Sequence, residues 1–185
     1  MALRSFRPLK NDQWRVRLSP VERTLLRALP EQAMPLVGSG DQSVQRLFPP
    51  AYVGEDHGDA QEDYRVATET ELADHHRQAL AELAASAGDG VISTDQLYLW
   101  LGAIEALRLV LGTQLDVSEG QTIDVANVGE DPRYAVYYFL SSLQDQIVAA
   151  LATTLGEPDP SASPPGWAPS DSTLPDWPSE PGAEP

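Results

Sequence analysis

The stretch STDQLYLWLGAIEALRLVL, residues 93–111, decides the fold of this chain. Ser93 stands three residues before Gln96, which is the spacing of a capping box, where each side chain bonds the other residue's backbone N–H. The large apolar residues that follow recur at helical spacing: Leu97, Trp100, Leu101, Ile104, Leu107 and Leu111. This wide apolar face predicts a long helix at the centre of the core.

Three further helices are predicted around this segment. Ser19-Pro20-Val21-Glu22 is a second capping-box pattern, and Pro30 is expected to bend or divide the helix that it starts. Thr68-Glu69-Thr70-Glu71 predicts the start of a helix that runs to about residue 87. Asp131-Pro132 predicts a last helix that ends near residue 155.

Residues 39–60 read as a loop, with an apolar anchor at Val44, Leu47 and Phe48 that should pack on the body. Residues 122–125 read as a briefly extended part of a second polar connection.

A β-hairpin is predicted near the N-terminus. Trp14 and Val16 alternate with Arg15 and Arg17, which is the period of a half-buried strand. Residues 10–13 read as a turn and residues 5–9 as a partner strand, which Pro8 marks as an edge strand. Residues 91–92 are expected to add a short third strand. The fold class is therefore mainly α, with a small N-terminal β-hairpin.

The last 29 residues, 157–185, differ from the rest in composition. They contain nine prolines, six acids and no cation, so they are predicted to be a disordered acidic tail beyond a domain at 1–156. Trp167 and Trp177 interrupt this tail. They are either short binding motifs or spacer residues.

Charge is distributed unevenly along the chain. The formal net charge is −16, yet residues 1–27 hold seven of the twelve cations and only two acids. One interpretation is a solvated edge that pairs with the acidic body, and the other is a docking edge for an acidic partner or a nucleic acid. In the second case Arg15, Arg17 and Arg23 are the candidate binding residues. The overall acidity argues against phosphate binding over the whole surface.

Catalytic and metal-binding patterns are absent from the sequence. The chain has no cysteine, Lys10 is its only lysine, and no nucleophile elbow or phosphate-binding glycine loop is present. His57 lies among carboxylates at a spacing that matches no known metal loop, and His75 and His76 are adjacent on a helix and cannot easily chelate one ion together. We therefore expect a non-enzymatic protein with no cofactor and no metal.

Arg108 stands in the nearly continuous apolar run Leu107-Arg108-Leu109-Val110-Leu111. One interpretation is that its side chain snorkels to an acid, either Glu105 by helical spacing or Asp145 through space. The other is that Arg108 is an exposed anchor for a partner protein, since arginine is enriched at binding hot spots.

No segment is long and apolar enough to predict a membrane span, and no export signal is visible, so a cytoplasmic location is expected.

A series of short motifs, in order and spacing, resembles the actinobacterial AosR-like family, formerly described as a domain of unknown function. The resemblance covers roughly residues 4–155, and its most specific part is the run Leu107-Arg108-Leu109-Val110-Leu111-Gly112 continued to Leu115. The other matching motifs are Ser19 to Leu26, Arg46-Leu47-Phe48-Pro49 with Ala51-Tyr52, Trp100-Leu101, and Tyr138-Phe139-Leu140 with Leu143-Gln144.

The resemblance implies a regulator of transcription in the oxidative-stress response that acts through contact with a sigma factor of the extracytoplasmic-function type. Redox sensing in that family is attributed to a cysteine pair, which this chain lacks. A thiol switch is therefore not carried over.

Two other functions remain open. Genes of the family commonly lie beside the gene for the Clp protease adaptor ClpS, which suggests an accessory factor or adaptor in Clp proteolysis. The basic hairpin with the helix after Ser19 could instead bind DNA directly.

Overall fold

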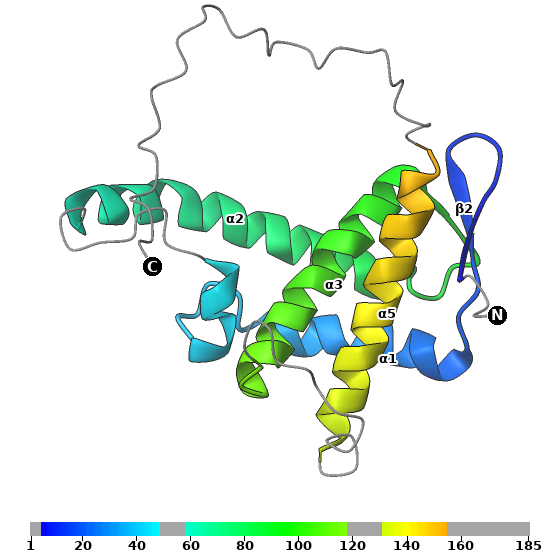
Figure 1. Cartoon of the computed structure of the whole chain (residues 1–185). Coiled ribbons are helices and arrows are strands. Elements are labelled where there is room, and N and C mark those ends of the chain that lie inside the picture. The colour runs from blue at the N-terminus through cyan, green and yellow to red at the C-terminus, as the bar shows by residue number, and fades with distance from the viewer. Residues whose placement is uncertain (1–4, 49–57, 118–130, 155–185) are drawn as a thin grey trace, which may run out of the picture. The chain divides into compact units, whose positions relative to one another are not determined.

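The computed structural model describes residues 5–48, 58–117 and 131–154, with side chains throughout except at residues 58–68. These residues form a helical body with a small antiparallel sheet at one side (Figure 1). In chain order the elements are β1 (Phe6–Pro8), β2 (Gln13–Val16), α1 (Pro20–Ala33), the short 3-10 helix η1 (Gln42–Leu47), α2 (Gly58–Ser86), β3 (Val91–Ser93), α3 (Thr94–Gln114) and α5 (Pro132–Ala152). The predicted fold class is confirmed.

Three of the four predicted helix starts are placed correctly by their capping patterns. Ser19 and Glu22 exchange both capping-box hydrogen bonds at the start of α1, and Ser93 and Gln96 do so at the start of α3. Asp131 accepts from the backbone N–H of Arg133 at the start of α5. Each cap satisfies N–H groups that the first helical turn leaves without a partner.

The helix α3 lies at the centre of the core, as predicted. It packs against α1, α2, α5 and η1, and Figure 1 shows it beside α5. Trp100, its largest residue, is fully buried, with its ring edge-to-face against Phe6 and its indole N–H donating to Ser86 Oγ at 2.8 Å. The centre of the core therefore ties α3 to both α2 and β1.

The sheet has the order β1-β2-β3, with both pairs antiparallel. The third strand confirms the prediction for residues 91–92, and β1, which contains Pro8, is an edge strand. Trp14 of β2 is buried, and its indole N–H donates to Thr94 Oγ1 at 2.9 Å. The turn is closed by Asn11 and Asp12 at positive φ, a conformation that short polar side chains tolerate. The hairpin is thus fixed to the first turn of α3.

Two predictions about helix boundaries are wrong. The helix α2 begins at Gly58, so the pattern at residues 68–71 lies inside it and is not a cap, and the predicted loop at 39–60 is partly helical. Residues 59–68 contain no Gly or Pro and are rich in helix formers and early acids, which explains the longer helix. Pro30 does not divide α1, which continues to Ala33.

The anchor after α1 packs as predicted. Val44 and Leu47 of η1 are buried against the body. Arg46 fixes this anchor to the segment after α3 by donating to the carbonyl of Val117 at 2.8 Å.

None of the helices in the described part of the chain is long and apolar enough to cross a membrane. His57, residues 122–125 and the predicted tail at 157–185 lie outside the described residues.

Candidate functional site

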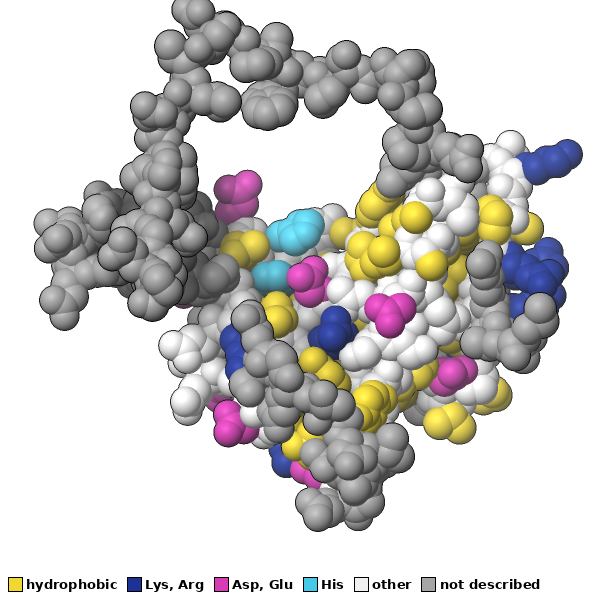
Figure 2. Space-filling view, viewed as in Figure 1, with side chains coloured by type: hydrophobic (Ala, Val, Ile, Leu, Met, Phe, Trp, Pro, Cys, Tyr) yellow, Lys and Arg dark blue, Asp and Glu magenta, His cyan; other side chains and the backbone are white. Residues whose placement is uncertain are grey.

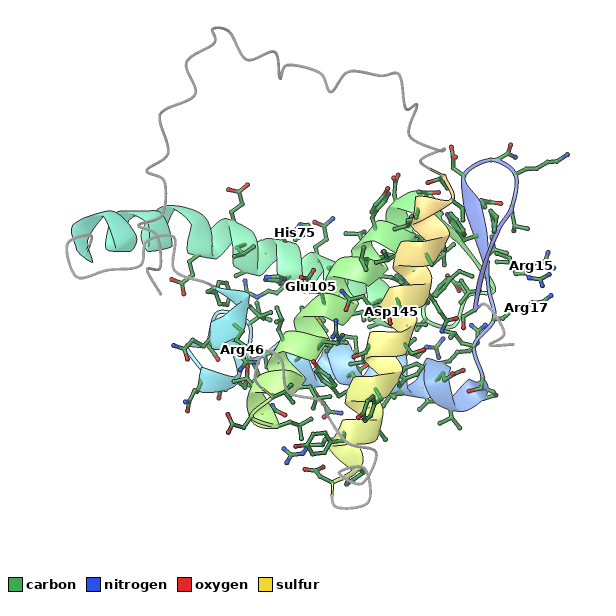
Figure 3. All side chains as sticks on the ribbon, in the orientation of Figure 1. Arg15, Arg17, Arg46, His75, Glu105 and Asp145 are labelled. Carbon is green, nitrogen blue, oxygen red and sulfur yellow. The ribbon has the colours of Figure 1, made fainter. Side chains whose placement is uncertain are left out.

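Two of the predicted binding residues, Arg15 in β2 and Arg17 directly after it, are exposed on the outward side of the hairpin. Residues along this strand alternate, so Trp14 and Val16 are buried while Arg15 and Arg17 are exposed. In Figure 3 both arginines point away from the helices, at the side of the molecule formed by the hairpin. The alternation therefore presents cations to solvent while anchoring the strand in the core.

The register of the hairpin brings two further cations to this surface. Arg7 of β1 lies directly opposite Arg15 of β2, and the backbone N–H of Arg17 donates to the carbonyl of Ser5 at 2.8 Å. Lys10 is exposed in the turn between the strands. We call Arg7, Lys10, Arg15 and Arg17 the basic hairpin; Figure 2 shows dark blue side chains gathered there.

The four cations of the basic hairpin have no ion-pair or hydrogen-bond partner for their side chains within the described ranges. Like charges directly opposite each other on a sheet destabilise it. Arg7 and Arg15 therefore carry an energetic cost that the described part of the protein does not offset. Among the described residues, the basic hairpin is thus an exposed edge without an acidic partner, and pairing with acids outside the described residues is not tested.

Arg23 has a different role from the one predicted for a binding residue. Its guanidinium donates to four backbone carbonyls, those of Val16, Leu18, Ala87 and Asp89, at 3.0–3.4 Å. These carbonyls belong to the end of β2, the link between β2 and α1, and the turn before β3. Arg23 therefore joins these segments, and its donors are used within the fold.

Arg108 does not pair with either acid that the sequence suggested. Its Nε donates to Ser141 Oγ at 2.9 Å, a terminal nitrogen donates to Gln144 Oε1, and its guanidinium lies 5.4 Å from the centre of the Tyr137 ring. All three partners are on α5. The half-buried guanidinium therefore joins α3 to α5.

Sequence reasoning did not place Arg7 opposite Arg15, although it counted Arg7 and Lys10 in the basic segment. The backbone N–H of Leu9 donates to the carbonyl of Gln13, so the turn is residues 10–12 and residue 7 lies opposite residue 15. The predicted turn at 10–13 is one residue too long and would set residue 8 opposite residue 15.

His76, on α2, is a further half-buried group. Its ring packs edge-to-face against Phe48 with centroids 6.1 Å apart, and its Nε2 is buried without a hydrogen-bond partner in the described structure. Burial lowers the pKa of His76, partly offset by a hydrogen bond to the backbone of Leu47 and the charge of Glu105. The fold therefore disfavours protonation of His76 where its ring packs against Phe48.

The basic hairpin can bind anions through its four cationic side chains. Arginine presents planar donors that match carboxylate and phosphate oxygens in pairs. Within residues 5–48, 69–117 and 131–154, no group of three His, Asp or Glu side chains could hold a metal ion.

The fold and the site define a mainly helical protein with an exposed cationic hairpin. A family model described as "Domain of unknown function (DUF2017)" matches residues 3–151. That match covers more than half of the chain, so the protein belongs to the DUF2017 family. No curated protein and no solved structure matches it.

Proposed function

We propose that this chain is a non-enzymatic, cytoplasmic regulatory protein that acts on transcription in the oxidative-stress response. It does so by protein–protein contact with a sigma factor, and the basic hairpin is the contact surface. No cysteine switch takes part, because the chain contains no cysteine.

The observation that carries this proposal is the arrangement of Arg7, Arg15 and Arg17 on one exposed face. These side chains meet no acid in the described structure, and the pair Arg7–Arg15 is costly without an acidic partner. Charged groups of opposite sign steer association and select partners. An acidic surface on a partner protein would supply the missing counter-charge.

The transcriptional setting is supported by the motif resemblance to the AosR-like family, which covers roughly residues 4–155. The sigma factor is therefore the partner that we propose to test first. The family match itself names no partner.

Direct DNA binding is the second candidate, because the same exposed arginines could contact phosphates. The charge of the whole chain disfavours it, since residues 28–185 hold five cations and 26 acids. A gel shift at low salt separates the two functions. Binding that disappears in the double variant Arg15→Glu/Arg17→Glu would favour DNA, and no shift at low salt would exclude it.

The experiment that tests the leading proposal is a pull-down from lysate under oxidising and reducing conditions. We expect an identified sigma factor or polymerase subunit with the wild-type chain in both conditions, because no thiol is available to switch. The variant Arg15→Glu/Arg17→Glu should recover much less of it. Recovery of neither component with the wild-type chain would contradict the proposal.

The matched control for this pull-down is Arg133→Glu. Arg133 is exposed and lies at the first turn of α5, whereas the sheet lies beside the C-terminal half of that helix. Its change to Glu alters the net charge as much as either single variant, Arg15→Glu or Arg17→Glu, so these single variants are compared with it as well. Recovery with this variant should equal that of the wild-type chain. An equal loss would mean that net charge alone drives capture.

A further inference from the structure

A row of three residues crosses the strands on the outward face of the sheet and combines charge with apolar surface. Arg7 of β1 lies opposite Arg15 of β2, and Arg15 in turn lies opposite Val91 of β3. Residues directly opposite each other on antiparallel strands share one face. Both arginines are exposed, and Val91 is 41% exposed. The row therefore presents two cations and then an aliphatic side chain to solvent.

Val91 is not part of the core beneath the sheet. Phe6, Trp14 and Ile92, one from each strand, are at most 3% exposed on the opposite face, where α3 and α5 contact the strands. The preference of strands for β-branched residues does not require an aliphatic residue at position 91, since Thr satisfies it as well. The apolar character of Val91 therefore belongs to the outward face.

A second apolar side chain lies at the end of β1. Leu9 is 37% exposed, and its backbone N–H donates to the carbonyl of Gln13 at 2.7 Å. Alternation along the chain puts Leu9 on the same face as Arg7, two positions before it. Of the five large hydrophobic residues that are exposed in the described part of the chain, two thus lie beside the paired arginines.

The acids near the hairpin do not neutralise its cations. Asp12 lies in the turn and Asp89 lies two residues before Val91; both are exposed, and neither forms an ion pair with the basic hairpin within the described residues. The four cations of the basic hairpin outnumber these two acids. Charge complementarity therefore requires an occupant that brings carboxylates, and the exposed aliphatic surface favours one that also brings an apolar side chain.

The spacing along the row matches a helix that lies across the strands. Neighbouring strands are about 4.7–4.9 Å apart, and side chains three or four positions apart on a helix have Cβ atoms about 5–6 Å apart. Successive turns of such a helix set one side chain against each member of the row. An extended segment that crosses the strands fits less well, because its same-face side chains are about 6.4–6.8 Å apart.

We propose that the row Arg7–Arg15–Val91 binds an acidic amphipathic helix of a partner protein. Two acids one turn apart on that helix bind the arginines, and an aliphatic residue one further turn along packs on Val91. This inference rests on the proposed function and specifies the element of the partner that makes the contact.

NMR titration of the isotope-labelled full chain with an alanine-based helical peptide tests the proposal. The peptide has about 18 residues, because shorter helices are marginal in water. It carries two Glu four positions apart and a Leu three positions after the second Glu. We expect the backbone amide signals of Arg7, Arg15 and Val91 to shift most. Largest shifts elsewhere would overturn the proposal.

Two comparison peptides separate the charges from the apolar contact. The first has the same composition with the Leu moved by two positions, so that it no longer shares a face with the acids. It should bind about fivefold more weakly, and equal affinity would overturn the role of Val91. The second has Gln in place of both Glu and should bind about tenfold more weakly. Equal affinity for this peptide would overturn the role of the arginines.

The variant Val91→Thr tests the apolar contact from the other side. It keeps the β-branched shape and replaces one methyl group by a hydroxyl, so it should weaken binding of the Glu–Leu peptide about fivefold without changing the salt dependence. Val148→Thr is the matched control, because Val148 is 50% exposed on α5 and lies outside the row. Circular dichroism checks that both variants stay folded. Unchanged binding by Val91→Thr, or an equal loss in Val148→Thr, would overturn the proposal.

Other occupants give distinct results. Self-association of the wild-type chain that Val91→Thr abolishes, measured by light scattering, would assign the row to a second copy and overturn the proposal. Tighter binding of a DNA duplex than of the Glu–Leu peptide, insensitive to Val91→Thr, would also overturn it.

Failure of this inference and failure of the proposed function are distinguishable. If the sigma factor binds wild-type chain and Val91→Thr equally but fails to bind Arg15→Glu/Arg17→Glu, only the helix inference falls. If the peptides bind as expected and no sigma factor binds, the row keeps its assignment and the proposed function falls.

Discussion

Arg7 on β1 lies directly opposite Arg15 on β2, so two cationic side chains share one face at paired positions of a small sheet. Both are exposed, and neither has an acidic partner in the described part of the chain. Residues paired in this way have Cβ atoms about 4.5–5.5 Å apart. The protein thus keeps a repulsive pair beside a well-buried core.

Replacing one of these two arginines by an acid should stabilise the protein. Arg7→Glu converts the repulsive pair with Arg15 into an attractive one, which should raise the free energy of unfolding by roughly 0.2–1 kcal/mol. Urea denaturation measures this change, and the gain should shrink at high salt. Arg7→Gln, which only removes the repulsion, should give a smaller gain. A loss of stability in Arg7→Glu would show that Arg7 has a structural role.

Arg23 should behave in the opposite way. Arg23→Ala removes donors to four backbone carbonyls and should lower the free energy of unfolding by about 1–3 kcal/mol. Arg17→Ala, at an exposed position nearby, should change it by no more than about 0.5 kcal/mol. Equal effects of the two substitutions in urea denaturation would contradict the distinction between a structural arginine and a binding arginine.

Ser86 links the core tryptophan to α2. Its Oγ accepts from the Trp100 indole N–H and donates to the carbonyl of Glu82 at 2.7 Å. Ser86→Ala leaves a buried N–H without an acceptor and should cost about 1–3 kcal/mol of stability. The exposed Ser39→Ala, which removes only local bonds, is the control. A cost below about 0.5 kcal/mol for Ser86→Ala would mean that water replaces the serine.

Stability should depend on pH through His76. Burial lowers its pKa in the folded state, so the unfolded chain binds the proton more readily. The stabilisation is therefore present above the ordinary imidazole pKa of about 6.5 and is lost as the pH falls through that value toward the folded pKa. Urea denaturation between about pH 7.5 and 5 should show this loss in the wild-type chain.

The variant His76→Asn should lose much of this pH dependence. His75→Asn changes the exposed neighbouring residue and serves as the control. If His76→Asn keeps the full dependence, groups other than His76 cause it.

Local patterns predicted much of this fold. The caps at Ser19, Ser93 and Asp131 were identified because a helix start depends on residues within one turn. The hairpin and the central helix followed from periodicity. The start of α2 was missed because Thr68–Glu71 resembles a cap wherever it stands, while the helix formers before it extend the helix.

The partners of Arg108 could not be predicted in the same way. Asp145 and Gln144 are adjacent on α5, and the rotation of that helix decides which of them faces α3. That rotation is set by packing across the whole interface. The exposure of Arg15 and Arg17, by contrast, followed from the alternation of residues 14–17, which is local.

The measurement that tests the central claim most directly is the affinity of the full chain for a purified sigma factor of the extracytoplasmic-function type. It should be made by calorimetry at two salt concentrations, with Arg15→Glu/Arg17→Glu and the control Arg133→Glu. We predict binding that weakens at high salt, falls at least tenfold (about 1.4 kcal/mol) in the double variant and is unchanged in the control. Binding that is equal in all three proteins, or absent in the wild-type chain, would contradict the account.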